Sequence, residues 1–514
     1  MKNKTKKIKS KNKSSRFKKG GKVIGSGGYG CIFSPALKCQ DTENEDKNSN
    51  KNEKISKLMT TRHTKEEYKE ITNFKPFIEK IPNYEDYFIM NEINICKPDK
   101  LSKMDLENYD KKCDTLKKDG ITSENINKSL NKVMALNMPN GGIDVGDYVD
   151  KIKNKSDLVN LNNSLISLLK NGILPMNKMN IYHCDVKESN ILVNEKINEK
   201  NKKLNTRLID WGLSTIYNMD NDIPSSMYSR PFQYNVPFSV ILFNNIFDDM
   251  YKKFLKENPN PDYYDIRAFV VDYIFVWNDT RGQGHIKAIN FIFSKLFENN
   301  LQHIDSDDKK LIIELDFTYY YIIEYLTKIL VEYTDVKAKK INLMDYFNNV
   351  FLKIIDVWGL IMAYSPFIEY FQKEHDEPIF KAIKNIFMKY LYEARLEPID
   401  IDALTEDLKS LNPLLENKIK KNTSLKSYSK TSNRKTRSRS NSLKSNSKSK
   451  LNSSIVKKYK TLSNGDINVK LISMTNKNKV QSSLTSITLE NKDRDRDISN
   501  KKKSSEKEEG EITE

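Results

Sequence analysis

A glycine-rich stretch near the N-terminus constrains the fold of this chain most. It reads GSGGYG, residues 25–30, and it stands between the short β-prone runs KVI and CIF. Glycines let a backbone approach a phosphate without a Cβ in the way, and they present N–H donors to it. A dinucleotide-binding loop would need a helix directly afterwards, whereas Pro35 follows here. The spacing therefore predicts a glycine loop between two strands, with an ordinary Gly-rich hairpin as the alternative.

The positive charge of the chain is concentrated at its ends. The 514 residues carry a net charge of +18, yet residues 1–22 hold 11 Lys and Arg and residues 418–460 hold 15, with no acidic residue in either range. Residues 23–417 are left with a net charge of −8. Basic tails can attract nucleic acid or acidic partners, although a solvated, disordered tail is the commoner case. We therefore expect three parts: a basic disordered arm at 1–20, a folded region at 21–415 and a disordered Lys/Ser-rich tail at 416–514.

The cysteine pattern favours an intracellular protein. The number of cysteines is odd and no C-x-x-C pair occurs, so we expect neither a disulfide framework nor a zinc site, and a reducing compartment fits best. The cysteines are Cys31, Cys39, Cys96, Cys113 and Cys184. No uninterrupted apolar stretch reaches about 18–20 residues, so no membrane span is expected. The nearest approach is interrupted by Lys353 and Asp356.

The order of short β-prone runs and helical patterns predicts an α+β fold. Strands are expected at 22–33, 87–95, 132–142, 190–193 and 207–211. Helices are expected at 64–80 and 159–174, and aromatic amphipathic helices at about 237–411; polar loops are expected at 40–54 and 194–206. Strands first and helices after indicate a small sheet-rich N-terminal part and a larger helical C-terminal part.

Two polar motifs follow the glycine loop. In YHCDVKESNILV, residues 182–193, Asp185 can receive a proton from a hydroxyl group, Lys187 can meet a transferred phosphate and Asn190 can turn back to a metal ion. In LIDWG, residues 208–212, Asp210 at the end of a strand can hold Mg²⁺. Phosphoryl transfer needs mainly such positioning and charge. A loop with chance polar spacing is the alternative for the first motif.

These elements, in this order, resemble the eukaryotic-type protein kinases. The chain looks most like the serine/threonine-protein kinases of mimivirus-like giant DNA viruses, because GSGGYGCIFSP is paired with RPFQYNVPFSV, residues 230–240. The resemblance covers roughly 23–240 and 345–370. It implies a bilobal kinase-like fold in a viral protein located in host cytoplasm, nucleus or virion. The implied N-lobe is 21–140 and the C-lobe 141–415, with a helical insertion at about 241–345.

The resemblance also implies ATP and Mg²⁺ as cofactors. Lys57 would clamp the α- and β-phosphates, with Lys38 as its competitor, and Glu67 would pair with it, with Glu66 and Glu70 left open. The glycine loop and its flanks would cover the phosphates: Ile24, Gly25, Ser26, Gly27, Gly28, Tyr29, Gly30, Cys31 and Ile32. Residues 138–142 look like the adenine-binding hinge. Asp356, in a D-x-W-x-x-G pattern, would bond the backbone of the catalytic loop.

The expected function is transfer of the ATP γ-phosphate to a serine or threonine hydroxyl of a protein substrate. Asp185 would be the catalytic base, and Asn190 and Asp210 would hold Mg²⁺. Cys184 replaces the arginine of H-R-D, which in many kinases grips a phosphate on the activation segment, and no A-P-E follows Gly212. These departures keep two alternatives open: a catalytically weak kinase-fold scaffold, and a kinase acting on a small molecule.

Overall fold

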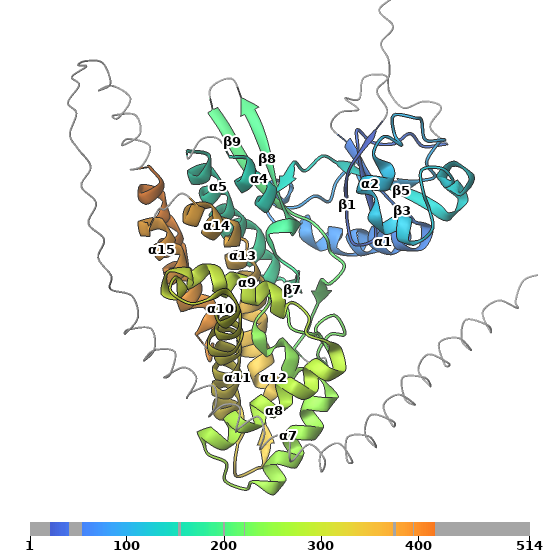
Figure 1. Ribbon diagram of the computed structural model, residues 1–514. Helices are drawn as coiled ribbons and strands as arrows, with labels where there is room; N and C mark the ends of the chain where they lie inside the picture. Colours follow the sequence, from blue (N-terminus) through green and yellow to red (C-terminus); the bar gives the residue numbers. More distant parts are fainter. Residues whose placement is uncertain are drawn as a thin grey trace, which may run out of the picture. The chain divides into compact units, whose positions relative to one another are not determined.

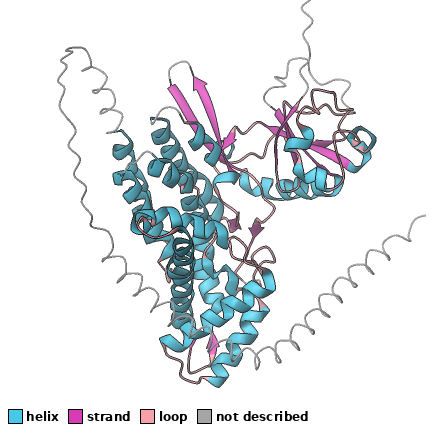
Figure 2. Cartoon of the chain, viewed as in Figure 1, coloured by secondary structure: helices cyan, strands magenta, loops and turns pink. Residues whose placement is uncertain are grey.

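The computed structural model is an α+β protein (Figures 1 and 2). It describes residues 21–40, 54–152, 156–198, 201–219, 222–373, 377–393 and 395–416. The predicted arm at 1–20, most of the polar loop at 40–54 and the tail beyond 416 lie outside the described residues. Within the described residues, a small antiparallel sheet near the N-terminus precedes a mostly helical remainder, as the order of sequence patterns predicted.

The N-terminal sheet has five antiparallel strands in the order β1-β2-β3-β5-β4. They are β1 (Lys22–Ser26), β2 (Gly30–Ser34), β3 (Lys54–Thr60), β4 (Asn94–Cys96) and β5 (Val133–Pro139). β1 and β2 form a hairpin with the glycines at its turn, which confirms the prediction from their spacing. Cys31, Phe33 and Leu58 are buried in one apolar cluster beside this sheet, so the hairpin is fixed from one face.

Helix α1 (Thr61–Ile78) follows β3 without a connecting loop and confirms the helix predicted at 64–80. The side chain of Thr60 accepts a hydrogen bond from the backbone N–H of His63, which satisfies one of the free donors of the first turn. Ile71, Phe74 and Ile78 recur at helical spacing and are buried. The helix therefore packs its apolar face under β3 and β5 and presents its charged residues elsewhere.

Two predictions of local structure are wrong. The strand expected at 87–95 is reduced to β4, because Phe88 and Met90 are buried from an irregular segment and the backbone reverses at Glu92, whose φ is +55°. The polar loop expected at 194–206 is instead a long hairpin of β8 (Ile191–Asn198) and β9 (Asn201–Leu208) (Figure 1). Backbone pairing does not require apolar side chains, so a polar sequence can form this hairpin.

The remainder is mainly helical, as predicted for 237–411. The helices are α2 (Tyr109–Lys112), α3 (Asp114–Lys118), α4 (Val145–Lys151), α5 (Ser156–Ser167), α6 (Leu174–Lys178), α7 (Asn245–Glu257), α8 (Tyr263–Arg281), α9 (Ile286–Leu296), α10 (Ser306–Ile312), α11 (Tyr320–Tyr333), α12 (Leu343–Tyr346), α13 (Leu352–Met362), α14 (Ser365–Lys373), α15 (Glu377–Phe387) and α16 (Ile401–Lys409). The short strands are β6 (Ile143–Asp144), β7 (Ile181–Tyr182), β10 (Thr215–Ile216), β11 (Thr334–Asp335) and β12 (Lys340–Ile341). α5 continues through a π-helical stretch, Leu168–Ile173, and so confirms the core helix predicted at 159–174.

One helical stretch, Leu343–Gln372, is long and apolar enough to cross a membrane, among the residues that the structure describes. It contains α13, in which every residue from Ile354 to Met362 is buried. Of its most apolar window, 83% is buried inside the protein. Because core helices meet the same length and composition criteria, this stretch is weak evidence for a membrane span.

Four of the five cysteines form disulfides, so the prediction that there is no disulfide framework is wrong. Cys31 is joined to Cys113 and Cys39 to Cys96, with Cα atoms 5.3 and 5.7 Å apart. The partners are 82 and 57 residues apart in sequence. Cys31 lies on β2 and Cys113 between α2 and α3, whereas Cys39 follows β2 and Cys96 lies on β4, so each pair meets only through the fold. Cys184 is free and buried. The expectation of a reducing compartment rested on unpaired cysteines and therefore loses that support.

Candidate active site

The loop from His183 to Asn190 is fixed by a carboxylate on the buried helix α13. Asp356 accepts hydrogen bonds from the backbone N–H of His183 at 2.9 Å and of Cys184 at 2.8 Å. This confirms the predicted contact of Asp356 with the loop backbone. Gly359 lies one turn further along α13, where a Cβ would stand 2.3 Å from the carbonyl oxygen of Val186. The absence of a side chain at Gly359 thus lets the helix and the loop touch.

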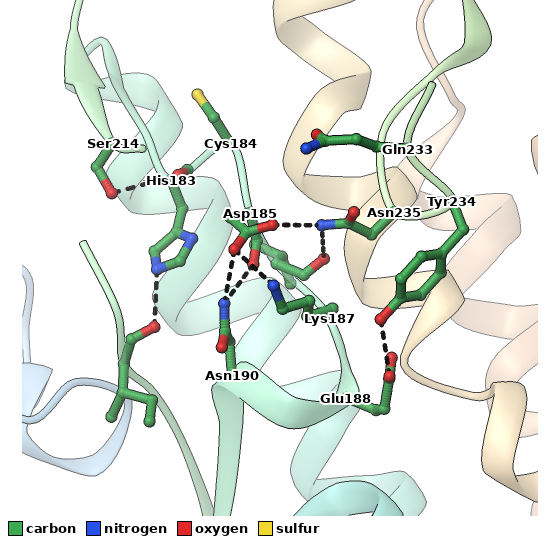
Figure 3. Close-up of polar contacts among 12 residues, drawn as sticks. His183, Cys184, Asp185, Lys187, Glu188, Asn190, Ser214, Gln233, Tyr234 and Asn235 are labelled. Atoms are coloured by element: carbon green, nitrogen blue, oxygen red, sulfur yellow. Dashed lines mark hydrogen bonds and ion pairs between the residues drawn. The ribbon is translucent and has the colours of Figure 1, made fainter. Parts of the chain in front are cut away.

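The carboxylate of Asp185 is held by three donors (Figure 3). Lys187 Nζ lies 2.8 Å and Asn190 Nδ2 3.0 Å from Oδ2, and Asn235 Nδ2 lies 2.8 Å from Oδ1. Burial alone would raise the pKa of Asp185, but the Lys187 ammonium and the hydrogen bonds from Lys187 and Asn235 outweigh it and lower the pKa below its ordinary value. The carboxylate is therefore ionised, oriented and able to accept a proton.

Asn190 and Asp210, the two predicted metal ligands, are brought together by a backbone hydrogen bond. The N–H of Ile209, the residue before Asp210, donates to the carbonyl oxygen of Asn190 at 3.0 Å. Within the described part of the chain, the Asn190 Oδ1 atom and the exposed Asp210 carboxylate have no hydrogen-bond partner. The described residues include no group of three or more His, Cys, Asp or Glu that could hold a metal ion. One carboxylate and one amide oxygen nevertheless suit Mg²⁺, which keeps several waters or substrate oxygens as its other ligands.

Trp211, next to Asp210, is buried among aromatic side chains. Its ring lies 5.4 Å from Phe74 of α1, 5.8 Å from Phe88 and 5.2 Å from His183, centroid to centroid. A ring nitrogen of His183, Nε2, is 3.1 Å from the carbonyl oxygen of Ile209. Burial lowers the pKa of His183, so its imidazole is neutral. These contacts join α1, the loop containing Asp185 and the Asp-Trp-Gly motif in one packed unit.

The structure pairs Lys57 with Glu67. Lys57 Nζ on β3 lies 2.6 Å from Glu67 Oε2 on α1, and both side chains are largely buried. Lys38 does not lie on this strand, and Glu66 instead faces Arg62 and His63. Lys57 Cε lies 3.7 Å from the position that a Cβ of Gly27 would occupy, so the lysine side chain reaches the glycine loop. Glu70 was the other residue left open as the partner of Lys57. Its pKa is raised, mainly by burial and then by the nearby Glu67 and Asp210 carboxylates.

The glycine loop is fixed at one end and open at its tip. A Cβ on Gly25 or Gly28 would meet no atom within 4 Å, and the flanking Ile24 and Tyr29 are exposed. Thr115 of α3 donates its hydroxyl to the carbonyl oxygen of Gly27 at 2.7 Å, and its Oγ1 lies 3.0 Å from Ser26 Oγ. The remaining predicted loop residues lie at the start of β2: Gly30, the disulfide-bonded Cys31 and Ile32. The open positions leave room for a ligand against the backbone.

Sequence reasoning missed a second supporting segment, residues 230–235. Asn235 is fully buried and donates to Asp185, and Tyr234 donates its hydroxyl to Glu188 at 2.7 Å (Figure 3). Trp358 of α13 donates to the carbonyl oxygen of Tyr234 at 3.1 Å. The segment is part of the RPFQYN stretch, which the resemblance singled out without assigning a role. Its sequence signal was weak: Gln233, Tyr234 and Asn235 stand between apolar residues in a short segment bounded by Pro231 and Pro237.

Comparison of the chain with models of known protein families found no match, and no curated protein matches it. The functional argument therefore rests on the residues and contacts described above.

Proposed function

We propose that this protein is a serine/threonine-protein kinase with a bilobal kinase-like fold, which transfers the γ-phosphate of ATP to a hydroxyl group of a protein substrate. The observation that carries the proposal is the environment of Asp185. Its ionised carboxylate is held by Lys187, Asn190 and Asn235, and the carbonyl oxygen of Asn190 accepts a hydrogen bond from the N–H of Ile209, the residue before Asp210. A base, a cation and two oxygen ligands for a metal thus lie in one small region, which is the set that phosphoryl transfer requires.

In this proposal Asp185, which its lowered pKa keeps ionised, accepts a hydrogen bond from the acceptor hydroxyl, orients it and receives its proton as the new P–O bond forms. Lys187 places a positive charge beside the group that is transferred. Lys57, fixed by Glu67, would hold phosphate oxygens beneath the glycine loop, whose open positions at Gly25 and Gly28 leave room for them. Mg²⁺ bound to Asp210 and Asn190 would supply positive charge against the phosphates. The rate gain comes from position and charge rather than from covalent catalysis.

A catalytically weak scaffold with the same fold is the second candidate, and Cys184 in place of the usual arginine is the observation that favours it. Against it, all polar groups that the reaction needs are present and oriented, and an ionised, three-fold bonded Asp185 is an arrangement that a scaffold does not need. A small-molecule acceptor would use the same residues, so the identity of the substrate distinguishes that case.

The test compares γ-phosphate transfer to a generic basic protein by the wild type, Asp185→Asn and the matched control Asp249→Asn, an exposed residue of α7. Loss of the base should lower the rate by about 100-fold or more, whereas the control should be unchanged. Equal transfer by the wild type and Asp185→Asn would refute the catalytic assignment. A wild type that binds Mg-ATP but transfers nothing would favour the scaffold.

A further inference from the structure

Arg230 is buried next to the catalytic loop, and no described carboxylate forms an ion pair with it. It is 6% exposed, and its Nη1 donates to the carbonyl oxygen of Cys184 at 2.9 Å while Nη2 donates to Gln233 Oε1. Its Nε is buried without a hydrogen bond, and no ion pair joins it to any described acidic residue. Burial lowers the pKa of Arg230, and the nearby Asp185 and Asp356 carboxylates oppose that shift without forming an ion pair with it; an arginine keeps its charge in proteins. Burying such a charge is costly, so its position needs a physical explanation.

Arg230 and Asn235 together hold three consecutive residues of the catalytic loop. Arg230 binds the carbonyl oxygen of Cys184, and Asn235 Nδ2 donates to the Asp185 carboxylate at 2.8 Å and to the carbonyl oxygen of Val186 at 3.2 Å. Cys184 itself has a positive φ of +61°, a conformation that needs support from its surroundings. The guanidinium thus supports the loop at the residue where the arginine of H-R-D is missing.

The segment that carries Arg230 is held in turn by residues 281–285, which are the last residue of α8 and the turn before α9. Arg281 Nε donates to the carbonyl oxygen of Ser229 at 3.0 Å, and the N–H of His285 donates to the carbonyl oxygen of Phe232 at 2.8 Å. Gly284, with φ +53°, lies so close that a Cβ would stand 2.2 Å from the carbonyl oxygen of Phe232. Residues 281–285, called the latch here, therefore fix the segment through the Arg281 side chain and through the close backbone contacts of Gly284 and His285, which a bulkier residue at 284 would break.

We propose that Arg230 is the positioning residue that orders the catalytic loop and that the latch locks Arg230 in place. This inference rests on the proposed kinase function. It assigns a role to the region at 241–345, which contains the latch. In many kinases the arginine of H-R-D binds a phosphate on the activation segment and so orders the catalytic loop; here the latch and Arg230 order that loop by direct contacts. The enzyme is then active as synthesised and needs no activating phosphorylation.

The first experiment removes phosphate from the full-length wild type with a phosphatase, verifies the product by mass spectrometry, removes the phosphatase and records initial transfer rates. We expect the same rate as for untreated protein, with no lag. A rate that falls at least 10-fold, or a lag that ends as phosphate is incorporated into the chain, would overturn the inference.

The second experiment measures kcat and the KM for ATP separately. Arg230→Met should lower kcat at least 10-fold and leave the KM for ATP within about two-fold, because the glycine loop and Lys57 are untouched. Arg230→Lys should recover part of kcat, because an ammonium group can still donate to the Cys184 carbonyl. Lys252→Met, which removes an exposed cation on α7, should match the wild type.

The third variant, Gly284→Val, tests the latch without touching Arg230. It should lower kcat as Arg230→Met does, and the double variant should be no worse than either single variant, since both changes release the same contact. If Arg230→Met fails to fold, Arg230→Lys and Gly284→Val decide. Unchanged kcat in the folded variants would refute this inference alone, whereas a wild type that transfers no phosphate refutes the proposed function and this inference with it.

Discussion

Gly359→Ala places a methyl group where α13 touches the loop from His183 to Asn190. The added Cβ would stand 2.3 Å from the carbonyl oxygen of Val186 and 2.7 Å from its Cβ, so the two elements must separate by roughly 0.7 Å to reach a 3.0 Å contact. The bonds from His183 and Cys184 to Asp356, now 2.9 and 2.8 Å, would lengthen to about 3.5 Å, beyond useful hydrogen-bond range. We expect a loss of about 1–3 kcal/mol in the free energy of unfolding and a lower kcat.

The sign of this effect is decisive, because helix propensity predicts the opposite. Alanine in a helix interior is favoured over glycine by about 0.5–1 kcal/mol. Gly146→Ala on α4 is the matched control, since the nearest atom to its Cβ would be a side-chain oxygen of Asp144 at 3.3 Å. Urea unfolding followed by tryptophan fluorescence suits the measurement, because all three tryptophans are buried. A Gly359→Ala protein as stable as the wild type would refute the close packing of α13 on the loop.

Three further predictions follow from single contacts. Titration with a thiol reagent should find no reactive cysteine in the native protein, because Cys184 is buried with a raised pKa and the other four cysteines are in disulfides. After unfolding without reductant, only Cys184 should react. Five reactive cysteines in the unreduced, unfolded protein would contradict the disulfide pairing. Thr115→Val should raise the KM for ATP several-fold by freeing the Gly27 carbonyl, Thr115→Ser should restore it, and an unchanged KM for Thr115→Val would refute the contact's role. The pKa of Asp185 is lower in the folded state than in the unfolded state, so its ionised form contributes stability that is fully present above the unfolded pKa of about 3.9 and is lost as the pH falls through the lower folded value. The difference in unfolding free energy between wild type and Asp185→Asn should therefore be constant above about pH 5 and shrink below about pH 4. A change in that difference between pH 5 and 8 would count against this account.

Local patterns were enough to predict the parts of the fold that depend on neighbouring residues. The glycines of the β1-β2 hairpin and the helical spacing of Ile71, Phe74 and Ile78 are short-range signals, and the structure has both elements. Burial misled the prediction at Phe88, because a buried aromatic side chain in an irregular segment has the same apolar pattern as a strand.

The candidate site was predicted where its residues lie in one motif and missed where they meet through the fold. Asp185, Lys187 and Asn190 lie within six positions, so their approach follows from the turn of one loop. Asn235 reaches Asp185 from 50 residues away, and Thr115 reaches Gly27 from 88 residues away. Such contacts depend on how separate elements pack against each other, and the spacing of residues along a single sequence does not reveal that packing. Both disulfides were missed for the same reason.

The two disulfides are nested, because Cys39 and Cys96 both lie between Cys31 and Cys113 in the chain. A single backbone cut anywhere between residues 39 and 96 would therefore leave the two fragments joined by both bridges. Such nicked protein would migrate as one species on a non-reducing gel and as two after reduction. The covalent connection of this part of the chain therefore does not depend on an unbroken backbone, and new chain ends introduced between β3 and β4 would leave Lys57 and the glycine loop tied to the rest of the protein.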